Sequence, residues 1–98
     1  SFDIDPAFEA QLAEAFRIIE SNSTAKIIIE GHADATGNDQ INVPLSELRA
    51  SQILDYLVRA GIDPDRLSIV GYGSSQPKGD NSTAEGRSQN RRVDFSVE

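Results

Sequence analysis

An aspartate and an arginine of this chain are placed so that together they could hold a small ligand. Asp34 lies just beyond the strand-like run 25–30, at the end of Gly31-His32-Ala33-Asp34, and Arg49 follows fifteen residues later, inside an amphipathic segment. A carboxylate binds an ammonium group, and a guanidinium binds a carboxylate, often through paired hydrogen bonds. The two side chains would therefore suit a small zwitterion, such as the head group of an amino acid.

The position of Arg49 favours a binding role. At roughly 100° per residue, Arg49 shares a stripe of its predicted helix with Ile53 and Leu57. An arginine on the apolar side of a helix needs a partner, or an opening through which a ligand enters. The N–H groups of residues 45–47, at the predicted helix start, could add donors for an anion. Asn42 precedes that start, and its spacing alone is more typical of a helix cap than of a ligand contact.

The elements that must position these residues follow from periodicity and turn signals. Helical spacing predicts a helix that begins at Asp5-Pro6 and ends near residues 21–23, with Phe2 and Ile4 as the remnant of an earlier strand. The further predicted elements are a strand at 25–30, a loop at 34–42, a helix at 44–60, a strand at 67–72, a helical turn at 83–87 within a long loop, and a strand at 93–97.

This order predicts an α+β two-layer sandwich, in which a βαβαβ-type mixed sheet has its helices packed on one face. The strands at 25–30 and 67–72 would be parallel neighbours joined by a right-handed crossover, which brings Asp34 and the start of the next helix to one sheet edge. Strand alternation places Arg91 on the helix-covered face with Val93 and Phe95, while Arg92 points away.

Composition limits the classes of function. With 98 residues, a single domain is expected. The formal net charge of −7 argues against nucleic acid as a partner, because phosphate binding needs a basic face. The absence of cysteine excludes disulfides and thiolate metal sites. No apolar run approaches the roughly 20 residues of a membrane-spanning helix.

Catalysis and metal binding find little support. His32 is the only histidine, and no serine lies in a G-x-S-x-G elbow. Asp34 and Asp39 both fall in a polar stretch, where aspartates are usually turn formers. Asp34, Thr36 and Asn38 resemble the start of a calcium loop only faintly, because Leu45 stands where the loop needs glutamate. We therefore predict no enzyme activity, no cofactor and no metal.

A series of short motifs in a fixed order resembles the OmpA-like C-terminal domain, the family of outer-membrane porin-like proteins, peptidoglycan-associated lipoproteins and flagellar stator proteins. The match extends over nearly the whole chain and is strongest from residue 27 onward. Its motifs are Gly31-His32-Ala33-Asp34, Gly37, Asn42, Leu45-Ser46, Arg49-Ala50, Tyr56-Leu57, Gly61, Arg66-Leu67, Gly71-Tyr72-Gly73, Pro77, Asn81, Thr83, Glu85-Gly86-Arg87 and Asn90-Arg91-Arg92-Val93.

The resemblance implies non-covalent binding of peptidoglycan, through the diaminopimelate of its stem peptide, to anchor a membrane protein to the cell wall. In the family, the aspartate and arginine that match Asp34 and Arg49 hold the ligand. Asn42 and Thr36 fall on further contact positions, and Arg91 belongs to the closing arginine pair. Residues 1–98 are then one domain excised from a longer protein of the periplasm or cell envelope, tethered to the outer membrane by a region outside this chain.

Two alternatives stay open, an envelope assembly module that binds no peptidoglycan and a homodimer. The chain also departs from the family pattern at two positions of the expected pocket wall. Ala33 replaces a usual threonine, and Ile41 replaces a usual aromatic residue. Neither change removes a charge of the expected binding site.

Overall fold

The computed structural model describes residues 6–98 and shows three strands and three α-helices. The predicted α+β class, with a mixed sheet and helices packed against it, is confirmed. In chain order the elements are α1 (Pro6–Ser21), β1 (Ile27–Gly31), α2 (Asp39–Arg59), a 3₁₀ turn (Pro64–Arg66), β2 (Leu67–Gly71), α3 (Ala84–Asn90) and β3 (Val93–Val97). The expected cap Asp5 and strand remnant at Phe2 and Ile4 lie outside the described residues.

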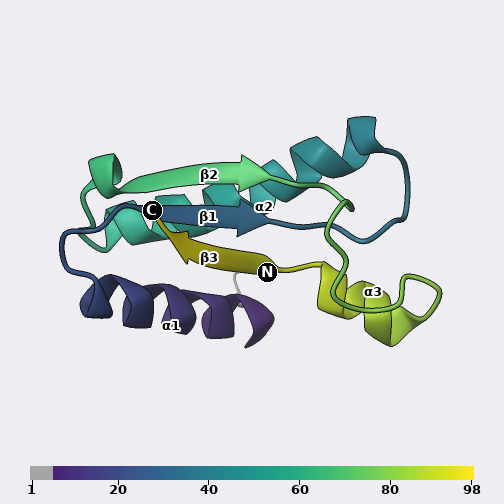
Figure 1. The fold of residues 1–98 in the computed structure, drawn as a ribbon, viewed down its shortest axis with the longest axis horizontal. Coiled ribbons are helices and arrows are strands. Elements are labelled where there is room, and N and C mark those ends of the chain that lie inside the picture. Colours follow the sequence, from purple (N-terminus) through teal and green to yellow (C-terminus); the bar gives the residue numbers. More distant parts are fainter. Residues whose placement is uncertain (1–5) are drawn as a thin grey trace.

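The sheet has the strand order β2-β1-β3 (Figure 1). β1 and β2 are parallel, and Ile27 pairs with Leu67, so α2 is the crossover that the sequence predicted. β3 runs antiparallel to β1, with Gly31 opposite Val93. The last residues of β1 and β2 and the first residues of β3 therefore lie side by side at one end of the strands. Helix α3 lies at the same end (Figure 1).

The core lies between the sheet and helices α1 and α2. Ile27 and Ile29 of β1 are fully buried and belong to one cluster with residues of both helices, such as Ala15 and Ile53. Alternate residues of β1 are buried, as expected for a strand that is covered on one face. This packing fixes the end of β1, and with it Asp34, relative to α2.

The N-terminal half of α2 approaches the ends of β1 and β2 very closely. A Cβ atom at Gly31 would lie 1.8 Å from the backbone carbonyl oxygen of Ser46, so only glycine fits there. The Ser46 hydroxyl donates to the carbonyl of Val43 at 2.8 Å and accepts the N–H of Gly73 at 2.9 Å. These contacts hold the helix segment that carries Arg49 against the strand end that carries Asp34.

The helix start was predicted five residues too late. α2 begins at Asp39, capped by Asn38, whose side chain accepts the N–H of Ile41 at 3.2 Å. Asn42 is therefore a helical residue, and its predicted capping role is wrong. Pro44, taken as the first helical residue, lies within α2, where its missing N–H gives up one bond to the carbonyl four residues earlier.

The long segment between β2 and β3 is ordered by one buried side chain. Asn90 is fully buried, and its Oδ1 atom accepts the N–H groups of Lys78 and Gly79 at 2.6 and 2.7 Å. Its Nδ2 atom donates to the carbonyl of Gly79 and the side chain of Asn81. The predicted helical turn is present as α3, with Thr83 as its N-cap. Arg91 follows this helix directly and is thereby fixed in place.

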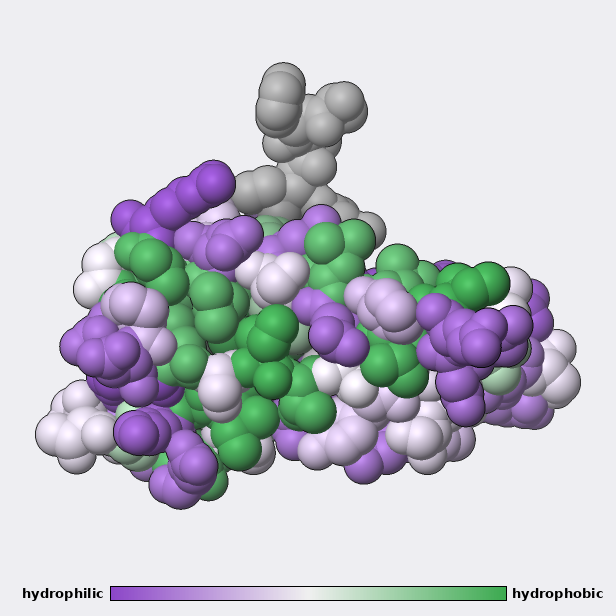
Figure 2. All heavy atoms as spheres, turned by 90° about the horizontal axis from the view of Figure 1, so that it is seen from above, coloured by the Kyte–Doolittle hydropathy of each residue, from purple (hydrophilic) through white to green (hydrophobic). Residues whose placement is uncertain are grey.

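Apolar side chains remain at the surface. Figure 2, seen from the side where β2 forms the sheet edge, shows a broad apolar area amid polar patches. Large apolar side chains with substantial exposure include Ile69 of β2 and Ile41, Leu45 and Leu48 of α2. Within residues 6–98, no helix is long and apolar enough to cross a bilayer.

Candidate functional site

Asp34 lies three residues beyond the end of β1 and is almost completely buried. Its Oδ1 atom accepts the backbone N–H of Thr36 at 2.8 Å, and its Oδ2 atom accepts Nη1 of Arg91 at 2.7 Å. The Thr36 N–H, with smaller effects from Arg91 and the Thr36 hydroxyl, lowers the pKa of Asp34 to about 2, although burial opposes the shift. The carboxylate is therefore ionised at any physiological pH.

Arg91 is the direct ionic partner of Asp34 in this structure. The strand alternation correctly placed Arg91 on the helix-covered side, whereas Arg92 bonds to Asp94 at 3.0 Å and to the carbonyl of Gln76. The sequence did not indicate that Arg91 would pair with Asp34, because this contact depends on where the loop after α3 returns to the sheet.

Arg49 points toward the same edge but does not bond to Asp34. Its Nη1 atom donates to the backbone carbonyl of His32 at 2.8 Å. Burial and the nearby charge of Arg91 lower the pKa of Arg49, while the charge of Asp34 raises it. The three charged groups thus influence one another electrostatically. The expected two-residue clamp is in fact a cluster of one carboxylate and two guanidiniums.

Of the two neutral candidates, Thr36 lies in the segment that joins β1 to α2, and Asn42 lies in α2 itself. Thr36 contacts Asp34 through its N–H and is itself exposed. Asn42 is buried in the first turns of α2, and its Nδ2 atom makes a long contact of 3.4 Å to the carbonyl of Gly37. Because α2 starts at Asp39, the N–H groups of residues 45–47 lie inside the helix, and the expectation that they would donate to an anion is wrong.

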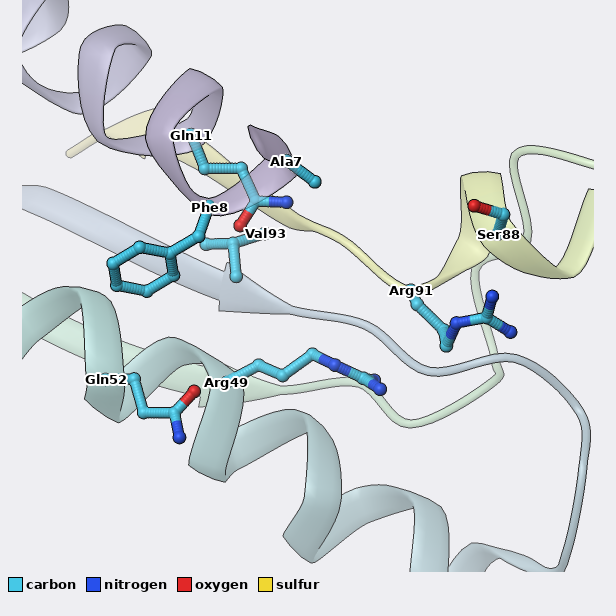
Figure 3. A pocket seen from close by; sticks show the side chains of 8 residues that line it. All are labelled: Ala7, Phe8, Gln11, Arg49, Gln52, Ser88, Arg91 and Val93. Carbon is cyan, nitrogen blue, oxygen red and sulfur yellow. The ribbon is translucent and has the colours of Figure 1, made fainter. Parts of the chain in front are cut away.

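A cleft of about 350 Å³ opens beside the charged cluster, between α1, α2 and the start of β3 (Figure 3). Both arginine side chains extend along it (Figure 3). We call it the arginine cleft; it is lined by Ala7, Phe8, Gln11, Arg49, Gln52, Ser88, Arg91 and Val93. Its volume falls within the range of small-molecule sites. The contribution of α1 to this wall was not predicted from the sequence.

A second polar group lies at the same strand end. His32 is buried, stacks on Tyr72 with ring centroids 5.4 Å apart, and directs Nε2 toward Asp94 at 3.3 Å. Burial and the charge of Arg92 lower the pKa of His32, so its ring is neutral near pH 7. The backbone carbonyl of His32 accepts a hydrogen bond from Arg49 and helps to position it.

Across residues 6–98, His, Asp and Glu side chains nowhere gather in a group of three or more that could hold a metal ion. Asp34, Thr36 and Asn38, which resembled the start of a calcium loop, serve other purposes. Asp34 accepts from Thr36 and Arg91, and Asn38 caps α2. The chemistry that this edge offers is recognition of charge by fixed hydrogen-bonding groups.

Known proteins have sequences similar to most of this chain. It is 47% identical over 88 residues to outer membrane porin F of Pseudomonas aeruginosa, a match that covers 89% of this chain and 24% of that protein. It is 47% identical over 73 residues to the peptidoglycan-binding protein ArfA of Mycobacterium tuberculosis, covering 74% of this chain and 22% of that protein. The chain therefore spans under a quarter of the length of these curated relatives.

The fold also has solved counterparts. The C-terminal domain of MotB from Helicobacter pylori superposes with a TM-score of 0.81 at 26% identity, covering 100% of this chain and 77% of that one. The model of the OmpA family matches residues 1–91. Sequence motifs, fold and family model agree, and this chain belongs to the OmpA family.

Proposed function

We propose that this domain binds peptidoglycan non-covalently by holding the diaminopimelate of the stem peptide, and that it anchors a larger protein to the cell wall. The observation that carries this proposal is the cluster at the end of β1. One buried carboxylate that is ionised at physiological pH, Asp34, lies there with two guanidiniums, Arg49 and Arg91, beside an open cleft. Diaminopimelate carries an ammonium and a carboxylate on one side-chain carbon, which matches opposite charges at one site.

Each charged group of the ligand has a natural partner. Both oxygens of Asp34 already accept one hydrogen bond, but a carboxylate oxygen has a further lone pair for an ammonium N–H. The carboxylate of the ligand would bind N–H groups of Arg49 that the His32 carbonyl does not use. Thr36 and Asn42 would line the other side of the head group.

A site of this size would be modest in affinity. A hydrogen bond to a charged group contributes roughly 1.5–3 kcal/mol. A few such bonds give a micromolar-to-millimolar dissociation constant for a single stem peptide. Retention on a wall would come from repeated attachment points along the polymer and from tethering.

The relatives support an envelope setting for this proposal. One is named an outer membrane porin and another a peptidoglycan-binding protein. We therefore place the domain in the periplasm or cell envelope, tethered to the outer membrane by a region outside this chain. Binding alone accounts for the proposed role, so we assign no catalytic step.

Co-sedimentation with purified, diaminopimelate-containing cell walls tests the proposal. The wild-type domain should pellet with the walls, and Arg49→Ala should stay in the supernatant while keeping nearly the same melting temperature. The matched control is Arg59→Ala, which removes an arginine from the last turn of the same helix, away from the cleft. Full wall binding by Arg49→Ala would overturn the proposal.

An assembly module is the second candidate, favoured by one observation. Ile41, Leu45 and Leu48 are exposed on α2 at the spacing of a single helix face. An exposed apolar face of this kind suits contact with another protein, which includes a second copy of this domain. If the domain fails to pellet with cell walls but sediments as a dimer, and Leu48→Lys makes it monomeric, the assembly role replaces peptidoglycan binding.

A further inference from the structure

Among the residues that the structure describes, the charges at the end of β1 do not balance. Two guanidiniums, those of Arg49 and Arg91, face one carboxylate, that of Asp34. Of the described acidic side chains, Asp34 is the one that raises the pKa of Arg49. A zwitterion adds one positive and one negative charge, so binding such a head group leaves the same single positive charge uncompensated. A partly buried guanidinium without a counter-ion is costly, and the protein as a whole is acidic.

The guanidiniums also keep most of their hydrogen-bonding capacity. Among the bonds of the described residues, Arg49 donates from Nη1 to the His32 carbonyl, and Arg91 donates from Nη1 to Asp34. A guanidinium has several further N–H donors in a planar fork, arranged to bind a carboxylate through two bonds. A ligand that brings only one carboxylate can satisfy one of these forks.

The arginine cleft supplies the space and further donors for another anionic group. Besides the two arginines, its wall carries the Gln11 and Gln52 amides, the Ser88 hydroxyl and the apolar ring of Phe8. None of the described residues in this wall is acidic. Figure 3 shows the two arginine side chains along one end of the cleft, with Phe8 and the glutamines toward the other.

We propose that the arginine cleft is a subsite for a second carboxylate of the same ligand, so that the preferred ligand is an amino-acid zwitterion attached to one further carboxylate. This inference rests on the proposed function and extends it. Asp34 takes the ammonium, Arg49 takes the head-group carboxylate, and Arg91 with the cleft donors takes the additional one. A stem peptide offers such a group at two places, the α-carboxylate of its glutamate and the chain-terminal carboxylate of diaminopimelate.

Four synthetic peptides separate these sources. The parent is N-acetyl-L-alanyl-γ-D-glutamyl-meso-diaminopimelate. Two derivatives are amidated singly, at the glutamate α-carboxylate or at the chain-terminal carboxylate, and the fourth is amidated at both. All four keep the zwitterionic head group. Measured by calorimetry, the doubly amidated peptide should bind about tenfold more weakly than the parent, and one of the single amides should account for that loss.

Two variants locate the effect in the cleft. Gln52→Glu adds a negative charge to the wall, and it should weaken binding of the parent peptide more than that of the doubly amidated peptide. Gln40→Glu makes the same change on the same helix, roughly 18 Å along its axis and outside the cleft wall, and should change neither affinity. Ser88→Ala, which removes one neutral donor, should reduce the preference for the parent without adding charge.

The outcomes distinguish the two proposals. Equal affinity for the parent and the doubly amidated peptide overturns the subsite while leaving head-group binding in place. Absence of binding by all four peptides overturns the proposed function as well. A preference for the parent that Gln52→Glu leaves intact would place the second carboxylate outside the arginine cleft, and the inference would again be wrong.

Discussion

Asp34, which is buried, and Arg91, which is exposed, form an ion pair with an Nη1–Oδ2 distance of 2.7 Å, although 57 positions separate them along the chain. The pair joins the end of β1 to the start of β3. It leaves Arg49, which bonds only to a backbone carbonyl among the described residues, as the guanidinium without a carboxylate of its own. The acid is therefore ionised and fixed in place, and a ligand has to add to the existing pair.

Removing Arg91 should raise the pKa of Asp34. The value would rise above about 2 but stay below that of an ordinary aspartate, because the N–H of Thr36, the larger cause, is unaffected. An NMR titration that follows the Asp34 carboxyl carbon in Arg91→Ala measures this shift. Arg87→Ala is the control, since Arg87 donates to the carbonyl of Asn81 and lies in the preceding helix. An unchanged titration midpoint in Arg91→Ala would contradict the electrostatic role given to the pair.

Acidification below about pH 6.5 should destabilise the fold through His32. Burial lowers the pKa of this ring in the folded state, so the unfolded chain takes up the proton more readily. The free energy of unfolding then falls as pH drops from the unfolded-state pKa toward the folded-state pKa. Because His32 is the only histidine, few other side chains titrate between pH 5.5 and 8.

Urea unfolding across that pH range tests this expectation. His32→Phe keeps an aromatic ring to stack on Tyr72 and cannot titrate, so its stability should vary much less with pH than that of the wild type. The same slope in both proteins would show that His32 is not the group responsible.

Substitution of Gly31 by alanine should destabilise the domain by about 3 kcal/mol, because the new methyl group would overlap the Ser46 carbonyl and push α2 away from β1. Gly61→Ala is an informative control. Gly61 has a φ of +102° but open space around it, so its cost, about 1–2 kcal/mol, comes from the backbone alone. Equal losses in the two variants, measured by urea unfolding, would argue against a tight contact at Gly31.

Much of the fold could be predicted because local signals agreed with tertiary needs. The apolar run of β1, the crossover to a parallel β2 and the alternation that places Arg91 on the side of the cleft all follow from side-chain periodicity and element order. The α2 boundary was misplaced because proline is common at the first helical position, so Pro44 suggested a start there with Asn42 just before it. The hydrogen bond from the Ile41 N–H to the Asn38 side chain shows that the helix begins earlier.

The partners of the charged residues could not be predicted for a different reason. The contact between Asp34 and Arg91 depends on the path of the segment between β2 and β3, which the buried amide of Asn90 fixes through four hydrogen bonds. Such a network has no periodic signature in the sequence. The same holds for the wall that α1 contributes to the arginine cleft, because it arises from helix packing across the sheet.

The most direct test of the account is an NMR titration of the isotope-labelled domain with the diaminopimelate stem tripeptide. We predict saturable shifts of the amide signals of residues 34–49 and of Arg91, and the loss of these shifts in both Asp34→Asn and Arg49→Ala. If those signals stay in place at millimolar peptide while the domain remains folded, the charged cluster at the end of β1 is not a stem-peptide site, and the central claim is wrong.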